Sequence, residues 1–158
     1  MNKHYKNILI ATDGSEHTEM AITHAIELAK ITGAQLHAVY VISLVSPPGI
    51  MEIKPDSVPE YYRTIDASIE GLKKILRHEG DEAIRYIEEK AKVAGVDVRK
   101  WIMEGQPAKE ILKLAEGESV DLIVMGTLGK SGIEKFLLGS VADKVIRGSK
   151  IPVLVVRK

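Results

Sequence analysis

The chain has 158 residues and a formal net charge of zero, which fits one domain and gives no electrostatic sign of a nucleic-acid or anionic-membrane partner. The absence of cysteine excludes disulfides, a thiolate nucleophile and a cysteine-ligated metal. No stretch approaches the ~18 apolar residues of a membrane span, and the opening has too short an apolar run for a signal peptide. We therefore expect a cytoplasmic protein with a single domain over residues 1–158.

The beginning of the chain is typical of a strand, a helix and a second strand. NILIAT, residues 7–12, is a short β-branched run that indicates a buried strand, and the Asp13-Gly14-Ser15 stretch after it is a turn signal. Residues 15–33 have helical spacing, with Ser15 as the candidate N-cap and Gly33 as the C-cap. Residues 34–42 then predict the second strand.

The middle and end of the chain continue this alternation. Residues 43–59 carry four prolines and no clean period, so we expect a mobile loop there. Apolar residues at three-and-four spacing then predict a long helix that ends near Gly95, with Gly80 as the place for any break. The later segments predict helices over 107–117 and 140–147 and strands over 96–103, 120–126 and 151–156.

Alternating strands and helices predict an α/β fold with a mainly parallel sheet and helices on both faces. The two most apolar strands, 7–12 and 120–126, should be central neighbours. In such sheets ligands bind beyond the carboxyl ends of the strands, where the strand order reverses. We therefore expect Asp13-Gly14-Ser15 and residues 126–131 to point into one crevice.

The glycines after the fourth strand come close to a phosphate-binding P-loop. In VMGTLGKSG, residues 124–132, the position of the first P-loop glycine is taken by Val124, and the loop from Gly126 is too short to wrap a phosphate. Gly139-Ser140 comes next and opens a predicted helix, whose free N–H groups and positive dipole end favour an anion. Two backbone segments are thus predicted to hold a polyphosphate between them.

The order and spacing of these segments resemble the universal stress protein family, in its ATP-binding subgroup. The resemblance runs from KNILIATDGSEHTEMAITHAIELA through GQPAKEILKLAE and VDLIVMGTLGKSG to LLGSVADKVIRGSKIPVLVVRK. It implies an adenine-nucleotide-binding, Rossmann-like fold with an open five-stranded parallel sheet of order 3-2-1-4-5. It also implies ATP with a magnesium or manganese ion, and a homodimer through the last strand, 151–156. The apolar edge of that strand is itself a reason for such pairing.

Carried over residue by residue, the resemblance implies a nucleotide site. Asp13 would meet the ribose or a bound divalent ion, Val41 would form a wall for the adenine, and Met125 would lie close to the nucleotide. Leu128 departs from the family pattern, because many relatives have a polar or basic residue there. The predicted cofactor-binding set is completed by residues at the end of the first strand and along the phosphates: Ala11, Gly126, Gly129, Lys130, Gly139, Ser140 and Val141.

The favoured function is a nucleotide-dependent regulatory or stress-response homodimer. Near the proposed site the sequence offers Lys130 and Asp13 but no clear base, so we assign no catalytic residue and expect ATP hydrolysis to be slow or partner-dependent. One alternative is a ligand-free dimeric interaction module of the same fold. Another is a flavin electron-transfer protein, because TDGSEHTE resembles a hydroxyl-rich loop around a flavin phosphate, although the chain is only 4% aromatic.

Overall fold

The computed structural model describes residues 5–44, 60–127 and 138–157, with the backbone alone for 60–66. Strands and helices alternate along these residues, as the sequence predicts. Their order is β1 (Asn7–Ala11), the 3-10 turn η1 (Glu16–Thr18), α1 (Glu19–Thr32), β2 (Gln35–Ile42), α2 (Glu60–Val93), β3 (Val98–Glu104), α3 (Pro107–Gly117), β4 (Leu122–Gly126), α4 (Ser140–Gly148) and β5 (Val153–Val156).

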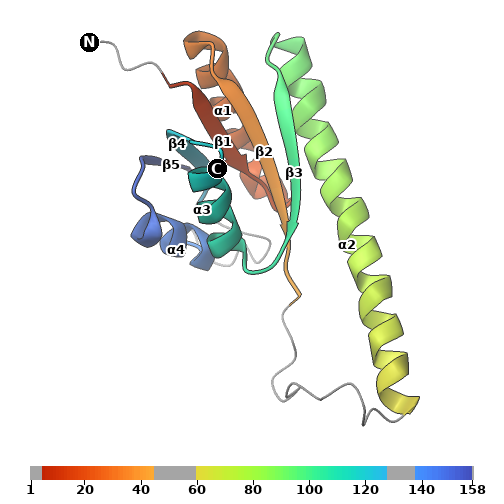
Figure 1. The fold of residues 1–158 in the computed structure, drawn as a ribbon. Helices are drawn as coiled ribbons and strands as arrows, with labels where there is room; N and C mark the ends of the chain where they lie inside the picture. Colours follow the sequence, from red (N-terminus) through yellow and green to blue (C-terminus); the bar gives the residue numbers. More distant parts are fainter. Residues whose placement is uncertain (1–4, 45–59, 128–137, 158) are drawn as a thin grey trace.

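The five strands form one parallel sheet of order β3-β2-β1-β4-β5 (Figure 1). β1 and β4 are neighbours, with Ile8 beside Leu122 and Ile10 beside Val124. Both strands are almost wholly buried, as expected for parallel strands that are covered on both faces. The predicted α/β fold, the strand order and the central pair are confirmed.

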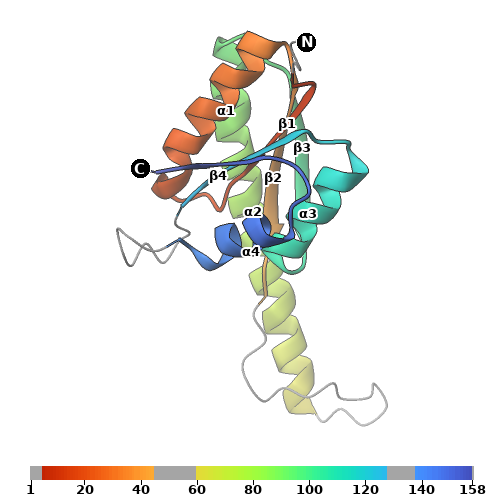
Figure 2. The same ribbon diagram turned by 90° about the vertical axis from the view of Figure 1, so that its left-hand side faces the viewer.

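Helices cover both faces of this sheet (Figures 1 and 2). On one face α1 and α2 pack on the sheet through a core that includes Ile22 and Ile87. On the other face α3 and α4 pack through a core that includes Ile111 and Val145. The chain moves outward from β1 through β2 to β3 in one direction and through β4 to β5 in the other. The strand order therefore reverses between β1 and β4, which is where this class of sheet binds ligands.

The first helix begins later than the sequence pattern predicts. Ser15 precedes the 3-10 turn η1 and makes no capping hydrogen bond through its side chain, and the α-helix begins only at Glu19. The reason is local, because the backbone N–H and the hydroxyl of Thr18 both donate to the Ser15 carbonyl and so hold a tight i to i+3 turn. Gly33 ends the helix as predicted, with a left-handed φ of 72°.

α2 is one continuous helix, so the break considered at Gly80 does not occur. Gly80 instead allows a close approach to the sheet, since a Cβ at this position would lie 2.7 Å from Cδ1 of the buried Tyr40. The N-terminal part of α2 extends beyond the sheet (Figures 1 and 2). Within the described residues, none of the helices combines the length and the apolar character that crossing a membrane requires.

Candidate functional site

The first part of the site is the turn that follows β1. Asp13 lies just beyond the strand, and its Oδ1 accepts a hydrogen bond of 2.9 Å from the backbone N–H of Ser15. Gly14 has a φ of +79°, a conformation that L side chains rarely adopt, so this turn favours glycine. The turn thus holds a carboxylate beyond the carboxyl end of a central strand.

The second part of the site is the end of β4. The backbone N–H of Thr127 donates to the carbonyl of Val156 in β5 at 3.2 Å. The carbonyl of Thr127 accepts a hydrogen bond of 2.6 Å from the N–H of Gly139. Because this second bond joins residues on either side of 128–137, it places the start of α4 beside the end of β4.

α4 brings its N-terminus to the same edge of the sheet. Its N-cap, Gly139, is extended at φ −60° and ψ 153°, and within the described residues no side chain makes a capping hydrogen bond there. The N–H of Asp143 donates to the Gly139 carbonyl at 2.9 Å and closes the first helical turn. The N–H groups of Ser140, Val141 and Ala142 precede that bond and have no acceptor within the helix. Such N–H groups, together with the positive end of the helix dipole, favour an anion at this end of α4.

These parts surround a cavity of about 160 Å³ at the carboxyl ends of β1 and β4. Its floor is mostly apolar, and Asp13 is the only titratable side chain among the described residues that line it. The cavity brings together eight residues that the sequence predicted for a binding site: Ala11, Asp13, Val41, Met125, Gly126, Gly139, Ser140 and Val141.

The other two predicted site residues, Gly129 and Lys130, lie outside the described residues, as does Leu128. Most of the predicted loop over 43–59 is outside them as well. Their proposed roles stay predictions.

The cavity also contains residues that the sequence reasoning missed. Val39 lies two residues before Val41 on the same side of β2, so the strand period of two would have found it. Pro107 and Ile111 belong to the first turns of α3. A proline is common at the first position of a helix, so Pro107 indicates that α3 begins soon after β3. A helix that begins at the carboxyl edge of the sheet lies beside the ligand-binding crevice, and this signal could have found Pro107 and Ile111. Thr12, Thr18, Thr127 and Ala142 complete the lining.

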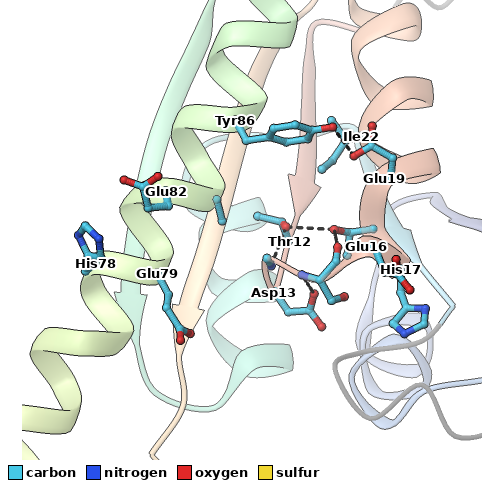
Figure 3. A pocket seen from close by; sticks show the side chains of 14 residues that line it. Thr12, Asp13, Glu16, His17, Glu19, Ile22, His78, Glu79, Glu82 and Tyr86 are labelled. Carbon is cyan, nitrogen blue, oxygen red and sulfur yellow. Dashed lines mark hydrogen bonds between the residues drawn. The ribbon is translucent and has the colours of Figure 1, made fainter.

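A second cavity of about 810 Å³ lies against the β1 turn, between η1, α1 and α2 (Figure 3). It shares Thr12, Asp13 and Thr18 with the first cavity. No group of three or more His, Cys, Asp or Glu residues in the described part of the chain is arranged to hold a metal ion. The second cavity is nevertheless rich in acids, with Asp13, Glu16, Glu19, Glu79 and Glu82 in its lining.

Glu19 joins α1 to α2 at this second cavity. Its carboxylate accepts a hydrogen bond from the Tyr86 hydroxyl (Figure 3) and another from the Lys90 ammonium. The bond from Lys90, followed by that from Tyr86, lowers the pKa of Glu19 below its ordinary value, against the effect of burial. The bond to Glu19 raises the pKa of Lys90 in the same way. The charged forms of both groups are therefore favoured.

Known proteins are similar to this chain in sequence and in overall fold. A sequence model of the universal stress protein family matches residues 4–157. Universal stress protein MJ0531 of Methanocaldococcus jannaschii is 41% identical over 154 residues, which cover 98% of this chain and 83% of that protein. The solved structure of MJ0577, from the same organism, has a TM-score of 0.78 at 32% identity and covers 98% of this chain and 97% of its own. A universal stress protein in complex with cAMP has a TM-score of 0.68 at 26% identity and covers 98% of each chain.

Proposed function

Because the chain belongs to the universal stress protein family, we propose that it is a single nucleotide-binding domain that holds ATP in the cavity between β1 and β4. The observation that carries the proposal is that eight of the predicted residues, from separate segments of the chain, line one cavity, from Ala11 at the end of β1 to Val141 in α4. The family relative in complex with cAMP supports an adenine nucleotide as the ligand class.

The chemistry of the cavity suits the parts of a nucleotide. Val39, Val41 and Met125 offer apolar surface to the base. The N–H groups at the start of α4 would hold phosphates, which extend along the helix N-terminus. Asp13 would meet the ribose or a divalent ion. A magnesium or manganese ion fits here as a companion of the nucleotide, since such ions commonly bind through one or two carboxylates plus substrate phosphates, and Asp13 supplies one carboxylate.

The proposed role is regulatory, with bound nucleotide favouring one conformation or partner surface. Phosphoryl transfer needs a group that orients the nucleophile and cations on the transferred phosphate. Asp13 is the only titratable group among the described lining residues, and its Oδ1 already accepts from Ser15. We expect ATP turnover below about 0.01 per second without a partner, the range of GTPases that act without an activating protein.

The proposal includes a homodimer through β5. This strand lies at the edge of the sheet beside β4, and its first three side chains are only partly buried. Pairing with the same strand of a second copy would satisfy its free backbone groups and cover those side chains. Such a contact is isologous and closes after two copies.

The first experiment asks whether the protein carries a nucleotide. Freshly purified protein is denatured and removed, and the released small molecules are identified by chromatography and mass. We expect near one adenine nucleotide per chain. If none is released and magnesium with ATP gives no thermal shift, the ligand-free dimeric module becomes the better reading.

The second experiment compares two glycine variants by calorimetry with magnesium and ATP. Gly139→Val places a branched side chain at the proposed phosphate position, on an extended backbone that valine adopts without strain. Gly117→Val is the matched control, because Gly117 ends α3 and a Cβ there meets nothing within 4 Å. We expect Gly139→Val to lose binding while Gly117→Val keeps it. Equal affinity in both variants would contradict the site.

A further inference from the structure

The β1 turn and the 3-10 turn η1 that follows it contain two buried hydroxyls, those of Thr12 and Thr18. Thr12 and Thr18 are 7% and 5% exposed, and their Oγ1 atoms lie 3.2 Å apart. Thr12 Oγ1 accepts a hydrogen bond of 3.1 Å from the backbone N–H of Gly14. Thr18 Oγ1 donates a hydrogen bond of 2.9 Å to the carbonyl of Ser15. The two side chains therefore form a connected path of hydrogen bonds between two backbone groups.

The direction of the central bond follows from the two ends. The Gly14 N–H can only donate and the Ser15 carbonyl can only accept. Thr18 has one hydroxyl proton, which is used on Ser15, so the hydroxyl of Thr12 must be the donor between the two threonines. Every donor on the path then has an acceptor. Such a network makes its surroundings rigid, and removing one member leaves another unsatisfied.

The residues on this path flank Asp13 in the sequence, because Thr12 precedes it and Gly14 follows it. The path starts at Gly14 and ends at Ser15, the two residues that follow Asp13, and the Ser15 N–H in turn holds Oδ1 of the carboxylate. The N–H of Thr12 also donates to the carbonyl of Val39 at 3.0 Å, which anchors the turn to β2. Thr12, Asp13 and Thr18 line both cavities, so these residues form part of the wall that the cavities share.

We propose that Thr12 and Thr18 are positioning residues for Asp13. Both hydroxyl protons are used within the path, so neither threonine has a donor left for a ligand, and we assign their effect to the turn. They hold the turn in one conformation before the ligand binds. The carboxylate of Asp13 is then already ordered, so binding loses less conformational entropy. This inference rests on the proposed nucleotide function of the smaller cavity.

The first test reads the turn without any ligand. Thr18→Val keeps the shape of the side chain and removes its hydroxyl, and Thr18→Ser restores the hydroxyl. Thr23→Val is the matched control, because the Thr23 hydroxyl donates to the Glu19 carbonyl within α1, at 3.2 Å, and is not part of the path. Amide hydrogen exchange of Gly14 and Ser15 is measured by NMR in each variant.

We expect Thr18→Val to accelerate exchange at both amides by about tenfold, the equivalent of one lost hydrogen bond. Thr18→Ser and Thr23→Val should keep the exchange of the wild type. Thr12→Val breaks the same path at its other hydroxyl and gives a second variant should Thr18→Val fail to fold. Unchanged exchange at Gly14 and Ser15 in the folded variants would overturn the proposal.

The second test asks whether Thr18 acts through Asp13. Binding of ATP with magnesium is measured by calorimetry for Thr18→Val, Asp13→Ala and the double variant. We expect Thr18→Val to weaken binding about tenfold in the wild-type background and to change it little when Asp13 is already alanine, with Thr18→Ser restoring affinity. Equal losses in both backgrounds would show a general packing effect and overturn the proposal. If the wild type binds no adenine nucleotide, the proposed function fails by itself, and the exchange result alone decides whether the hydroxyls fix the turn.

Discussion

His37 is a buried histidine whose tautomer is fixed by its neighbours. It is 1% exposed on β2 and stacks on Trp101 of β3, with ring centroids 6.3 Å apart. The indole N–H of Trp101 can only donate, so Nδ1 of His37 accepts at 3.2 Å, and Nε2 then donates to Oδ1 of Asn7 at 3.3 Å. Burial lowers the pKa of His37, and the charge of Arg99 adds to this effect while that of Glu118 opposes it. The neutral form is therefore favoured.

The stability of the protein should depend on pH through His37. Since its pKa is lower in the folded chain, the unfolded chain binds more protons as the pH falls. The stabilisation is complete above the ordinary pKa of 6.5 and is lost as the pH falls through the folded pKa. Trp101→Phe removes the donor to Nδ1, which should raise the pKa of His37 and shrink the loss of unfolding free energy between about pH 7 and 5.

Urea denaturation followed by circular dichroism at several pH values measures this effect in both proteins. The variant should also lose about 1 kcal/mol at neutral pH from the missing hydrogen bond. A pH dependence equal to that of the wild type would show that Trp101 does not favour the neutral histidine.

At the scale of elements, α2 contains two glycines with opposite surroundings. A Cβ at Gly80 would lie 2.7 Å from the ring of Tyr40, whereas a Cβ at Gly71 meets nothing within 4 Å. Alanine favours a helix over glycine by up to about 1 kcal/mol. We therefore expect Gly71→Ala to raise the free energy of unfolding by that amount, and Gly80→Ala to lower it by about 1–2 kcal/mol because overpacking outweighs the helical gain.

Chemical denaturation of the two variants checks this prediction, and Gly71→Ala serves as the control for helix propensity. If both variants were stabilised equally, α2 would not approach the sheet at Gly80 as closely as described.

The contact between α1 and α2 at Glu19 should contribute to stability in a pH-dependent way. The pKa of Glu19 is lowered by Lys90 and then by Tyr86, so its contribution is present above the ordinary value of 4.5 and is lost as the pH falls through the folded pKa. The side chains of Glu19 and Lys90 are each more than a third exposed, so solvent screening keeps the contribution of the ion pair to stability below about 1 kcal/mol. Glu19→Gln should therefore destabilise at pH 7 and have little effect near pH 3.

Glu27→Gln gives the control, since Glu27 is an exposed acid on the same helix. Thermal denaturation of the wild type and both variants at pH 7 and near pH 3 measures the effect. A Glu19→Gln penalty that persists at acid pH would mean that packing, rather than the charge of Glu19, joins the helices.

At the scale of the whole molecule, the sheet was predictable because buried parallel strands leave a strong apolar signal. The runs at 7–12 and 120–126 indicated the central pair, and the family resemblance supplied the full order. Strand ends differ from the prediction by one or two residues. The contact of Gly80 with Tyr40 was not predictable from helical periodicity, because it depends on how a helix residue packs on a strand residue 40 positions earlier in the chain.

The site residues that come after the carboxyl ends of strands were predictable from the sequence. Asp13 and Gly139 could be assigned to one edge because each follows an apolar strand in a parallel sheet. Ile111 was missed because it reaches the cavity through the packing of α3, which periodicity alone does not orient. The path through Thr12 and Thr18 was missed because its bonds depend on the conformation of the turn.

The edge of β5 determines how two copies would assemble. The carbonyls of Pro152 and Val156 accept hydrogen bonds from Ile123 and Thr127 on the β4 side. Backbone groups alternate in direction along a strand, so the N–H groups of Val153 and Val155 point away from β4. These groups are the ones that a second β5 would bond in the proposed dimer.

Val155→Pro should dissociate the proposed dimer while the fold remains. Proline removes one outward N–H per chain and leaves the bonds to β4 in place, which is why edge strands tolerate it. By the two-fold symmetry each substitution acts twice, so the dissociation constant should rise by at least about tenfold. Val155→Ala is the control, because it removes side-chain volume and keeps the N–H. Sedimentation equilibrium should give monomers only for Val155→Pro. Equal dimerisation of both variants would place the interface elsewhere, and equal dissociation would mean that the Val155 side chain, rather than the strand edge, holds the copies together.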